Sequence, residues 1–189
     1  MSPANYFWRM RCYVGLGSNL GDREAALDSG VRALALRWGP ASAVSPLYET
    51  AAWGMPAATP AFLNAVAAFE LAPSFDRALG PLALLDDALE IETAHGRQRV
   101  SSAGPGAPRY LSRTLDIDLL LIDGIPFSHP RLTLPHPELM NRRFVLQPLC
   151  EIAPDLQMPG HGLTFAQCLH RLERTRPTDD EITVRVHRH

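Results

Sequence analysis

The apolar residues of this chain follow the two-residue period of a strand in some segments and the 3.6-residue period of a helix in others. Glycine, proline and aspartate stand between most of these segments, where turns and helix caps are expected. In chain order, the pattern predicts a strand at 10–17, a helix from Asp22 to Trp38, strands at 42–50 and 62–71, a helix from Pro73 to about Ala94, and a strand at 116–123.

This order of strand, helix, strand, strand, helix and strand is that of the ferredoxin-like, or split βαβ, arrangement. It predicts the α+β class: a βαββαβ antiparallel sheet with helices packed on one face. The pattern then adds helices at 138–149 and 164–174, and an alternating run at 182–186 that we expect to be an extra edge strand. We expect residues 1–9 to be an extension and residues 10–189 to be one domain.

Composition excludes several classes of protein. The 189 residues are 46% hydrophobic and 20% charged, which is ordinary for a soluble globular domain. The net charge of -2 gives no general attraction for nucleic acid or anionic lipid. No apolar run approaches the roughly 20 residues of a membrane span, and none resembles a signal peptide. We therefore expect a cytosolic protein, with Cys12, Cys150 and Cys168 as reduced structural thiols.

Lysine is absent, since all 18 basic residues are arginine. A Walker-A phosphate loop and a Schiff-base mechanism both need lysine, so the sequence excludes both. Any phosphate binding must rest on arginine, whose planar guanidinium group contacts phosphate oxygens at two points.

The run Gly15-Leu16-Gly17-Ser18-Asn19-Leu20-Gly21 lies between the first strand and the first helix. It does not match the dinucleotide-binding fingerprint, because the third glycine comes one position too late. We expect these glycines to let a ligand approach the backbone closely, and a structural turn is an equal alternative on this segment alone.

Two carboxylates stand two positions apart at the start of the apolar strand 116–123. On a strand, Asp116 and Asp118 project side by side from one face. Two such carboxylates repel unless a cation lies between them, and Mg²⁺ accepts carboxylate oxygens while it also binds substrate phosphates. The pair therefore predicts a metal site, and two solvated acids at a strand end are the alternative.

A segment rich in glycine, proline and serine, 100–108, precedes the paired acids. Arg97 and Arg99 flank it on one side, and Arg109 and Arg113 on the other. This arrangement predicts a lid over an anionic ligand, with a plain hairpin connection as the alternative.

Glu92 is predicted on the core-facing edge of its helix, near the C-terminal end. Negative charge is unfavourable there, so Arg97 or Arg99 is expected to compensate it. A surface glutamate paired with a surface arginine is the alternative.

Six motifs along the chain together resemble the 6-hydroxymethyl-7,8-dihydropterin pyrophosphokinase family. The resemblance covers roughly residues 10–158, and the fourth motif is highly specific. In chain order the motifs are Gly17-Ser18-Asn19-Leu20-Gly21-Asp22, Phe62-Leu63-Asn64-Ala65, Gly96-Arg97-Gln98-Arg99, Arg113-Thr114-Leu115-Asp116-Ile117-Asp118-Leu119-Leu120, Leu134-Pro135-His136 and Asn141-Arg142-Arg143-Phe144.

The resemblance implies an enzyme of folate biosynthesis that moves the pyrophosphoryl group of ATP to the hydroxymethyl oxygen of 6-hydroxymethyl-7,8-dihydropterin, giving AMP. It implies two Mg²⁺ ions held by Asp116 and Asp118, with Arg97 and Arg113 completing the catalytic set. These two small molecules are the expected partners of a cytosolic monomer that binds neither nucleic acid nor membrane.

The resemblance also implies two binding pockets. The ATP pocket would be formed by Glu92, Arg97, Arg99, Arg109, Arg113, Arg131, Thr133, His136 and Arg142. The pterin pocket would be formed by Thr50, Trp53, Phe62, Asn64, Tyr110 and Phe144. Asn64 can offer a donor and an acceptor to a pterin edge, and Phe144 can stack on its ring. Without the resemblance, the two phenylalanines would be interpreted as core residues and His136 as a surface histidine.

The chain departs from the family pattern in and around the lid segment and at Arg143. Tyr110-Leu111-Ser112 replaces a stretch like Trp-Gly-Pro, the loop from Arg97 to Arg109 is longer, and Arg143 stands where a small residue is common. One alternative is a diverged paralogue that acts on another pterin, and a second is an inactive relative kept as an interaction partner. An RNA-binding module is disfavoured, because the chain lacks an RNP-type aromatic run and paired acids repel a phosphate backbone.

Overall fold

A central antiparallel sheet organises the chain in the computed structural model, which describes residues 10–52, 58–96, 112–175 and 182–185. The predicted extension 1–9 lies outside these residues. The strand order is β5-β1-β4-β3-β8, and β2 also pairs with β4. The strands of this sheet are β1 (Arg11–Ser18), β2 (Ala41–Val44), β3 (Leu47–Thr50), β4 (Phe62–Glu70), β5 (Asp116–Ile122) and β8 (Ile182–Arg185).

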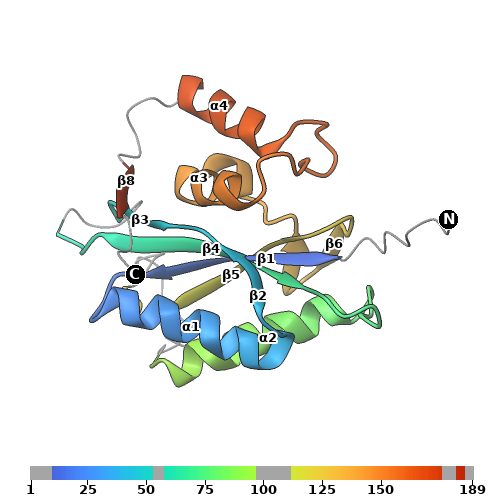
Figure 1. Cartoon of the computed structure of the whole chain (residues 1–189), viewed down its shortest axis with the longest axis horizontal. Coiled ribbons are helices and arrows are strands. Elements are labelled where there is room, and N and C mark those ends of the chain that lie inside the picture. The colour runs from blue at the N-terminus through green and yellow to red at the C-terminus, as the bar shows by residue number, and fades with distance from the viewer. Residues whose placement is uncertain (1–9, 53–57, 97–111, 176–181, 186–189) are drawn as a thin grey trace, which may run out of the picture.

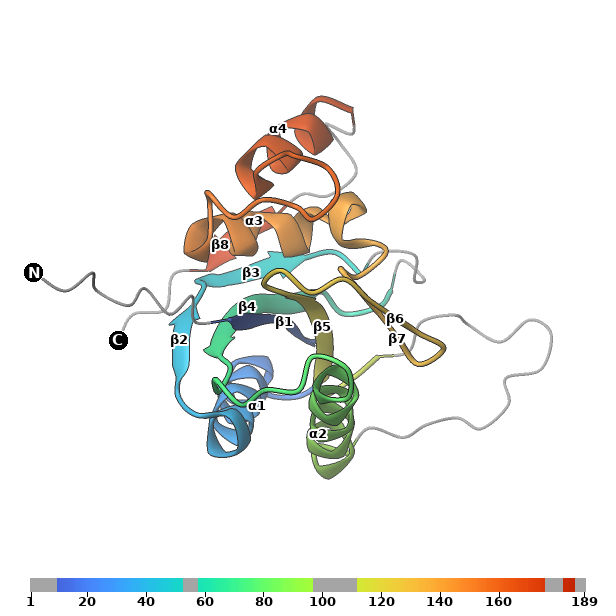
Figure 2. The same cartoon turned by 90° about the vertical axis from the view of Figure 1, so that its right-hand side faces the viewer.

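Helices cover the sheet, and a short hairpin lies beside β5 (Figure 2). The helices are α1 (Arg23–Trp38), α2 (Gly80–Ala94), α3 (Arg143–Ile152) and α4 (Phe165–Thr175), and a 3₁₀ turn spans Leu139–Asn141. The hairpin consists of β6 (Phe127–His129) and β7 (Leu132–Leu134). None of the described helices is long and apolar enough to cross a membrane.

The connectivity confirms the ferredoxin-like prediction. β4 lies between β1 and β3 and is antiparallel to both, while α1 makes the crossover that joins β1 to the β2–β3 side. β5 pairs with the other edge of β1. The alternating run near the C-terminus is also confirmed as an edge strand, since β8 pairs with β3.

The two helices of the βαββαβ unit share one face of the sheet, as predicted, and the two added helices lie over the other face. α1 and α2 pack on one face of the sheet, and α3 and α4 lie over the other (Figure 1). The physical reason is visible in β4, whose residues from Leu63 to Phe69 are all buried. A strand that is apolar on both sides needs cover on both faces.

The first predicted strand after α1 is in fact two strands. β2 ends at Val44 and β3 begins at Leu47, because Pro46 has no N–H to donate to the sheet. Ser45 compensates for the break, since its Oγ accepts a hydrogen bond of 3.0 Å from the backbone N–H of Val66.

Two helices begin later than predicted. The carboxylate of Asp76 accepts the backbone N–H of Ala78 at 2.7 Å, which fixes a turn after Pro73 and delays α2. Pro81 then occupies the first turn of α2, where the missing N–H costs nothing. Similarly, the predicted start at residue 138 is a short 3₁₀ turn, and α3 follows it.

Two leucines of α1 test the packing of this helix on the sheet. Leu34 is fully buried in the core, whereas Leu36 is 90% exposed. We expect Leu34→Ala to lower the free energy of unfolding by about 2–5 kcal/mol, because it leaves a cavity under the sheet. The control, Leu36→Ala, should change it by less than about 0.5 kcal/mol. Urea denaturation of both variants measures the difference, and equal effects would contradict the packing described.

Candidate functional site

A hollow opens on the α3 side of the sheet because β1 has two glycines on that face. In β1, Gly17 lies between Asp116 of β5 and Asn64 of β4, and Gly15 pairs with Asp118. Residues two apart on a strand face the same side, so two neighbouring positions on the floor have no side chain. The resulting cavity has a volume of about 330 Å³.

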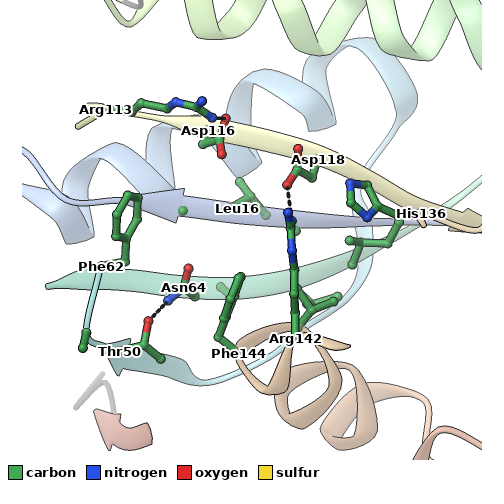
Figure 3. Close-up of a pocket in the computed structure, with 17 residues that line it drawn as sticks. Leu16, Thr50, Phe62, Asn64, Arg113, Asp116, Asp118, His136, Arg142 and Phe144 are labelled. Atoms are coloured by element: carbon green, nitrogen blue, oxygen red, sulfur yellow. Dashed lines mark hydrogen bonds and ion pairs between the residues drawn. The ribbon is translucent and has the colours of Figure 1, made fainter. Parts of the chain in front are cut away.

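The walls of this first cavity come from strands β1, β3, β4 and β5, the start of α3 and the segment before it (Figure 3). Polar and aromatic side chains predicted from the sequence make up much of the wall. They are Thr50, Phe62, Asn64, Arg113, Asp116, Asp118, His136, Arg142 and Phe144.

The paired acids share one face of β5, as the sequence predicts. Asp116 and Asp118 are half-buried and line the cavity, while Ile117 between them is buried on the opposite side. Each carboxylate contacts a guanidinium group: Arg113 pairs with Asp116, and Nη1 of Arg142 lies 3.4 Å from Asp118 Oδ2. Arginine thus balances the charge of both acids.

The donor set around these carboxylates suits Mg²⁺. Among the described residues, no group of three or more histidine, cysteine, aspartate or glutamate side chains forms a metal cluster. Mg²⁺ is usually held by one or two carboxylates, with substrate phosphates and water completing its shell. Two adjacent carboxylates in a cavity lined with arginine match that preference.

Hydrogen bonds fix the orientation of the Asn64 amide. Its Nδ2 donates to Thr50 Oγ1 at 2.9 Å and to the carbonyl of Tyr48 at 3.5 Å. Because the NH₂ group is held by β3, Oδ1 points toward Gly17, where an added Cβ would lie only 3.3 Å away. Asn64 therefore presents an acceptor to the cavity (Figure 3).

Two aromatic rings flank the cavity. Phe62 stands at the start of β4, and Phe144 stands in the first turn of α3 (Figure 3). The guanidinium carbon of Arg142 lies 5.8 Å from the centre of the Phe144 ring, within the range of a cation–π contact. This arrangement can hold a flat heterocycle between apolar faces.

His136 is held as one tautomer. Its Nδ1 accepts the backbone N–H of Glu138 at 3.1 Å, so the proton of the neutral ring must be on Nε2. Burial, and then the charge of Arg142, lowers the pKa of His136 below its usual 6.5. The ring is consequently a neutral donor near pH 7.

A second cavity of about 330 Å³ adjoins the first. It is lined by β5, α2 and the β6–β7 hairpin, with Arg131 and Thr133 on its wall, and Arg131 also forms an ion pair with Asp86. Asp118 and His136 line both cavities, which meet at these two side chains. Among the described residues predicted for ATP, Arg131, Thr133 and His136 line the second cavity, whereas Arg113 and Arg142 line the first cavity beside the predicted pterin residues.

Glu92 lies under this junction and lines neither cavity. It is fully buried, and its Oε1 accepts the backbone N–H of Ile117 at 2.8 Å. That amide belongs to the residue between the paired acids. The burial predicted for Glu92 is confirmed, its role as an ATP ligand stays a prediction, and the contact seen here holds β5 in place.

Asn19 is a site residue whose role the sequence did not reveal. It is buried, its Oδ1 accepts the backbone N–H of Arg113 at 2.7 Å, and its Nδ2 donates to Ser112 Oγ at 3.0 Å. These bonds tie the segment before the paired acids to the glycine-rich turn. The only signal in the sequence was the position of Asn19 in the first motif.

Five predicted site residues lie outside the described residues, and so does the predicted lid, 100–108. Their roles stay predictions: Trp53, Arg97, Arg99, Arg109 and Tyr110. Arg143, which departs from the family pattern, forms an ion pair of 2.9 Å with Glu173 of α4.

Comparisons with known proteins agree with the geometry. A family model described as 7,8-dihydro-6-hydroxymethylpterin-pyrophosphokinase (HPPK) matches residues 13–154. The chain is 42% identical over 164 residues to a 2-amino-4-hydroxy-6-hydroxymethyldihydropteridine pyrophosphokinase of Methylorubrum extorquens, a match covering 86% of this chain and 94% of the relative. It is 43% identical over 153 residues to the protein of the same name from Pseudomonas aeruginosa, covering 79% and 84% of the two chains.

Solved structures share the fold. An HPPK-DHPS from Plasmodium falciparum superimposes with a TM-score of 0.68 at 11% identity, over 91% of this chain. This chain covers 48% of that longer protein. At such low identity the likeness shows the fold alone.

Substitution of Glu92 tests how β5 is held. We expect Glu92→Ala to lower the free energy of unfolding by about 1–3 kcal/mol, because it leaves a buried backbone N–H of Ile117 without its acceptor. Glu92→Gln keeps an acceptor oxygen at that position and should lower the free energy of unfolding by less than Glu92→Ala does. Glu90→Ala, on the exposed face of the same helix, is the control and should leave stability within measurement error. Equal stability of all four proteins by guanidinium denaturation would refute the assignment.

Proposed function

The chain belongs to the 7,8-dihydro-6-hydroxymethylpterin-pyrophosphokinase family, and on this premise we propose how its residues carry out the reaction. The enzyme transfers the pyrophosphoryl group of ATP to the hydroxymethyl group of 6-hydroxymethyl-7,8-dihydropterin, a step of folate biosynthesis. The hydroxymethyl oxygen loses its proton to solvent and bonds to the β-phosphorus, and the bond from that phosphorus to the oxygen of the α-phosphate breaks. AMP and the pterin diphosphate are the products.

One observation carries the assignment of the substrates: Asp118 and His136 line both cavities. We assign the pterin to the first cavity and the nucleotide to the second. The triphosphate then crosses the junction, where its β-phosphorus can meet the hydroxymethyl group. Catalysis of such a transfer depends mainly on positioning the two reactants and on stabilising the charge of the group in transfer.

In the first cavity, the pterin ring lies between Phe62 and Phe144. The oriented Oδ1 of Asn64 accepts from an N–H of the pterin edge, and the bond to Thr50 keeps the amide from rotating. A buried acceptor that would stay unpaired with another ligand favours a substrate with an N–H at that place.

At the junction, arginine and histidine contact the phosphates. Arg113 and Arg142 now pair with the acids, and each guanidinium group has further N–H donors for phosphate oxygens. His136 donates its Nε2–H, and Arg131 and Thr133 line the nucleotide side. These donors stabilise the negative charge that spreads over the group in transfer.

Asp116 and Asp118 would hold Mg²⁺, and we propose two ions, as the family resemblance implies. When bound, Mg²⁺ neutralises the triphosphate and polarises its oxygens. The carboxylates need no other protein ligand, because substrate phosphates complete the shell of this metal. Their fixed spacing on β5 keeps the metal site at the junction.

We also propose that residues 10–189 form one catalytic domain that acts as a cytosolic monomer. One sheet takes strands from both ends of the chain, β1 and β8, which supports a single domain. Cys12, Cys150 and Cys168 are free thiols in the structure, which fits a reducing compartment. Among the described residues, four large apolar side chains are exposed, which is ordinary for the surface of a monomer: Leu20, Leu36, Val44 and Leu79.

The reaction can be tested at the metal ligands. We expect Asp118→Asn to lower turnover by roughly 10²-fold or more, because it removes a charge that holds Mg²⁺ at the junction. Chelation of divalent ions should lower the turnover of the wild-type enzyme by at least as much as this substitution does. Asp28→Asn, in an exposed pair with Arg32, is the control. Chromatography of the nucleotides would show AMP as product, and formation of ADP would exclude a pyrophosphokinase.

The glycine floor of the first cavity gives a second test. In Gly17→Ala the new Cβ lies 3.3 Å from Asn64 Oδ1 and 3.7 Å from the Phe62 ring. We expect the Kd of the pterin to rise by about tenfold because of this crowding, with the Kd of an ATP analogue unchanged. Calorimetric titrations measure both constants. An equal loss for both ligands would contradict the separate placement of the two substrates.

A further inference from the structure

Arg23, the first residue of α1, joins two backbone segments on the side of the sheet away from the cavity. Its Nη1 donates to the carbonyl of Ala61 at 2.8 Å and forms an ion pair of 2.8 Å with Glu49 Oε1. Both charged side chains are 23% exposed, so water screens this contact only in part. The mechanism above does not use Arg23.

The two partners of Arg23 are chain neighbours of two cavity residues. Glu49 precedes Thr50 at the end of β3, and Ala61 precedes Phe62 at the start of β4. Thr50 and Phe62 face each other as the last pair of the β3–β4 ladder, and both line the first cavity (Figure 3). Beyond this pair the strands separate.

We propose that Arg23 is a positioning residue for the pterin substrate. It clamps the ends of β3 and β4 together where they would otherwise fray, and so holds Thr50 and Phe62 in register. Because Thr50 in turn orients the amide of Asn64, the effect reaches the acceptor in the cavity. The inference rests on the proposed function, since it concerns the same pocket.

The position of the clamp explains why it acts on one substrate. Side chains alternate along a strand, so Glu49 points to the face covered by α1 while Thr50 points into the cavity on the opposite face. Arg23 therefore contacts the strand ends from the face opposite the first cavity, and it lines neither cavity. The second cavity is built from β5, α2 and the hairpin, none of which Arg23 contacts in the bonds described.

A neighbouring contact should let variants of Arg23 keep their fold. Asn19 Nδ2 donates to the carbonyl of Pro60 at 3.3 Å, one residue before the carbonyl that Arg23 holds. Asp22 still caps α1 through its bond to the N–H of Ala25. When Arg23 is replaced, the carbonyl of Ala61 thus loses its hydrogen bond, but Asn19 still holds the neighbouring carbonyl of Pro60.

The test is direct binding with three variants. We expect Arg23→Gln to raise the Kd of 6-hydroxymethyl-7,8-dihydropterin, measured by calorimetry with a non-hydrolysable ATP analogue present, by about tenfold, because binding must then itself order the strand ends that carry Thr50 and Phe62. The Kd of the ATP analogue should change less than about twofold, within the scatter of neutral surface substitutions. Arg23→Lys, which keeps the charge and a donor, should restore part of the affinity. Arg32→Gln, on an exposed face of α1, is the matched control.

Each outcome decides between the proposals. If wild-type protein binds no pterin, the proposed function fails. If wild type binds but Arg23→Gln binds equally well, only the clamp is refuted. Equal weakening of pterin and ATP analogue, or an equal loss in Arg32→Gln, would also refute the clamp, because it would indicate general damage. A rise in the pterin KM with little change in the ATP KM during turnover would support it.

Discussion

The absence of side chains at Gly15 and Gly17 is the constraint on which the site depends. β1 lies between β4 and β5. A Cβ at Gly17 would lie 3.3 Å from Asn64 Oδ1 and 4.0 Å from Asp116 Cβ. A Cβ at Gly15 would contact Leu120 at 3.5 Å, so side chains at these positions would fill the cavity. Every other strand of the pocket contributes polar or aromatic groups to that space. The cavity therefore exists because two side chains are missing from its floor, and the well-packed core around it keeps it from collapsing.

Charge balance is the second condition of the site. Asp116 and Asp118 lie side by side in a half-buried place, which costs free energy unless cations compensate them. In a chain without lysine, arginine fills this role. Its fork of donors can contact a carboxylate and a phosphate together, so the groups that balance the acids without substrate also suit a triphosphate.

Backbone hydrogen bonds place these side chains from outside the cavity. Glu92 holds the strand of the acids, Asn19 holds the segment before them, and Glu138 fixes the tautomer of His136. The contacts of Glu92 and Asn19 join segments that are far apart in the chain, and the contact of Glu138 orients the His136 ring, which lines both cavities. The site is thus supported by polar contacts that themselves do not face the substrate, as preorganised sites require.

The sequence by itself determined the order of strands and helices, the edge strand β8, the shared face of Asp116 and Asp118, and the family, because these follow from local periodicity and from motifs. The hydrophobic pattern did not show the break at Pro46 or the late start of α2, because it continues through these local turns. It also did not show the second helical layer, which depends on contacts between distant segments. Only the tertiary structure decided that Glu92 supports β5 from beneath, and that Asp118 and His136 stand where two cavities meet. Periodicity tells which face a residue takes, but strand register and packing decide what lies opposite it.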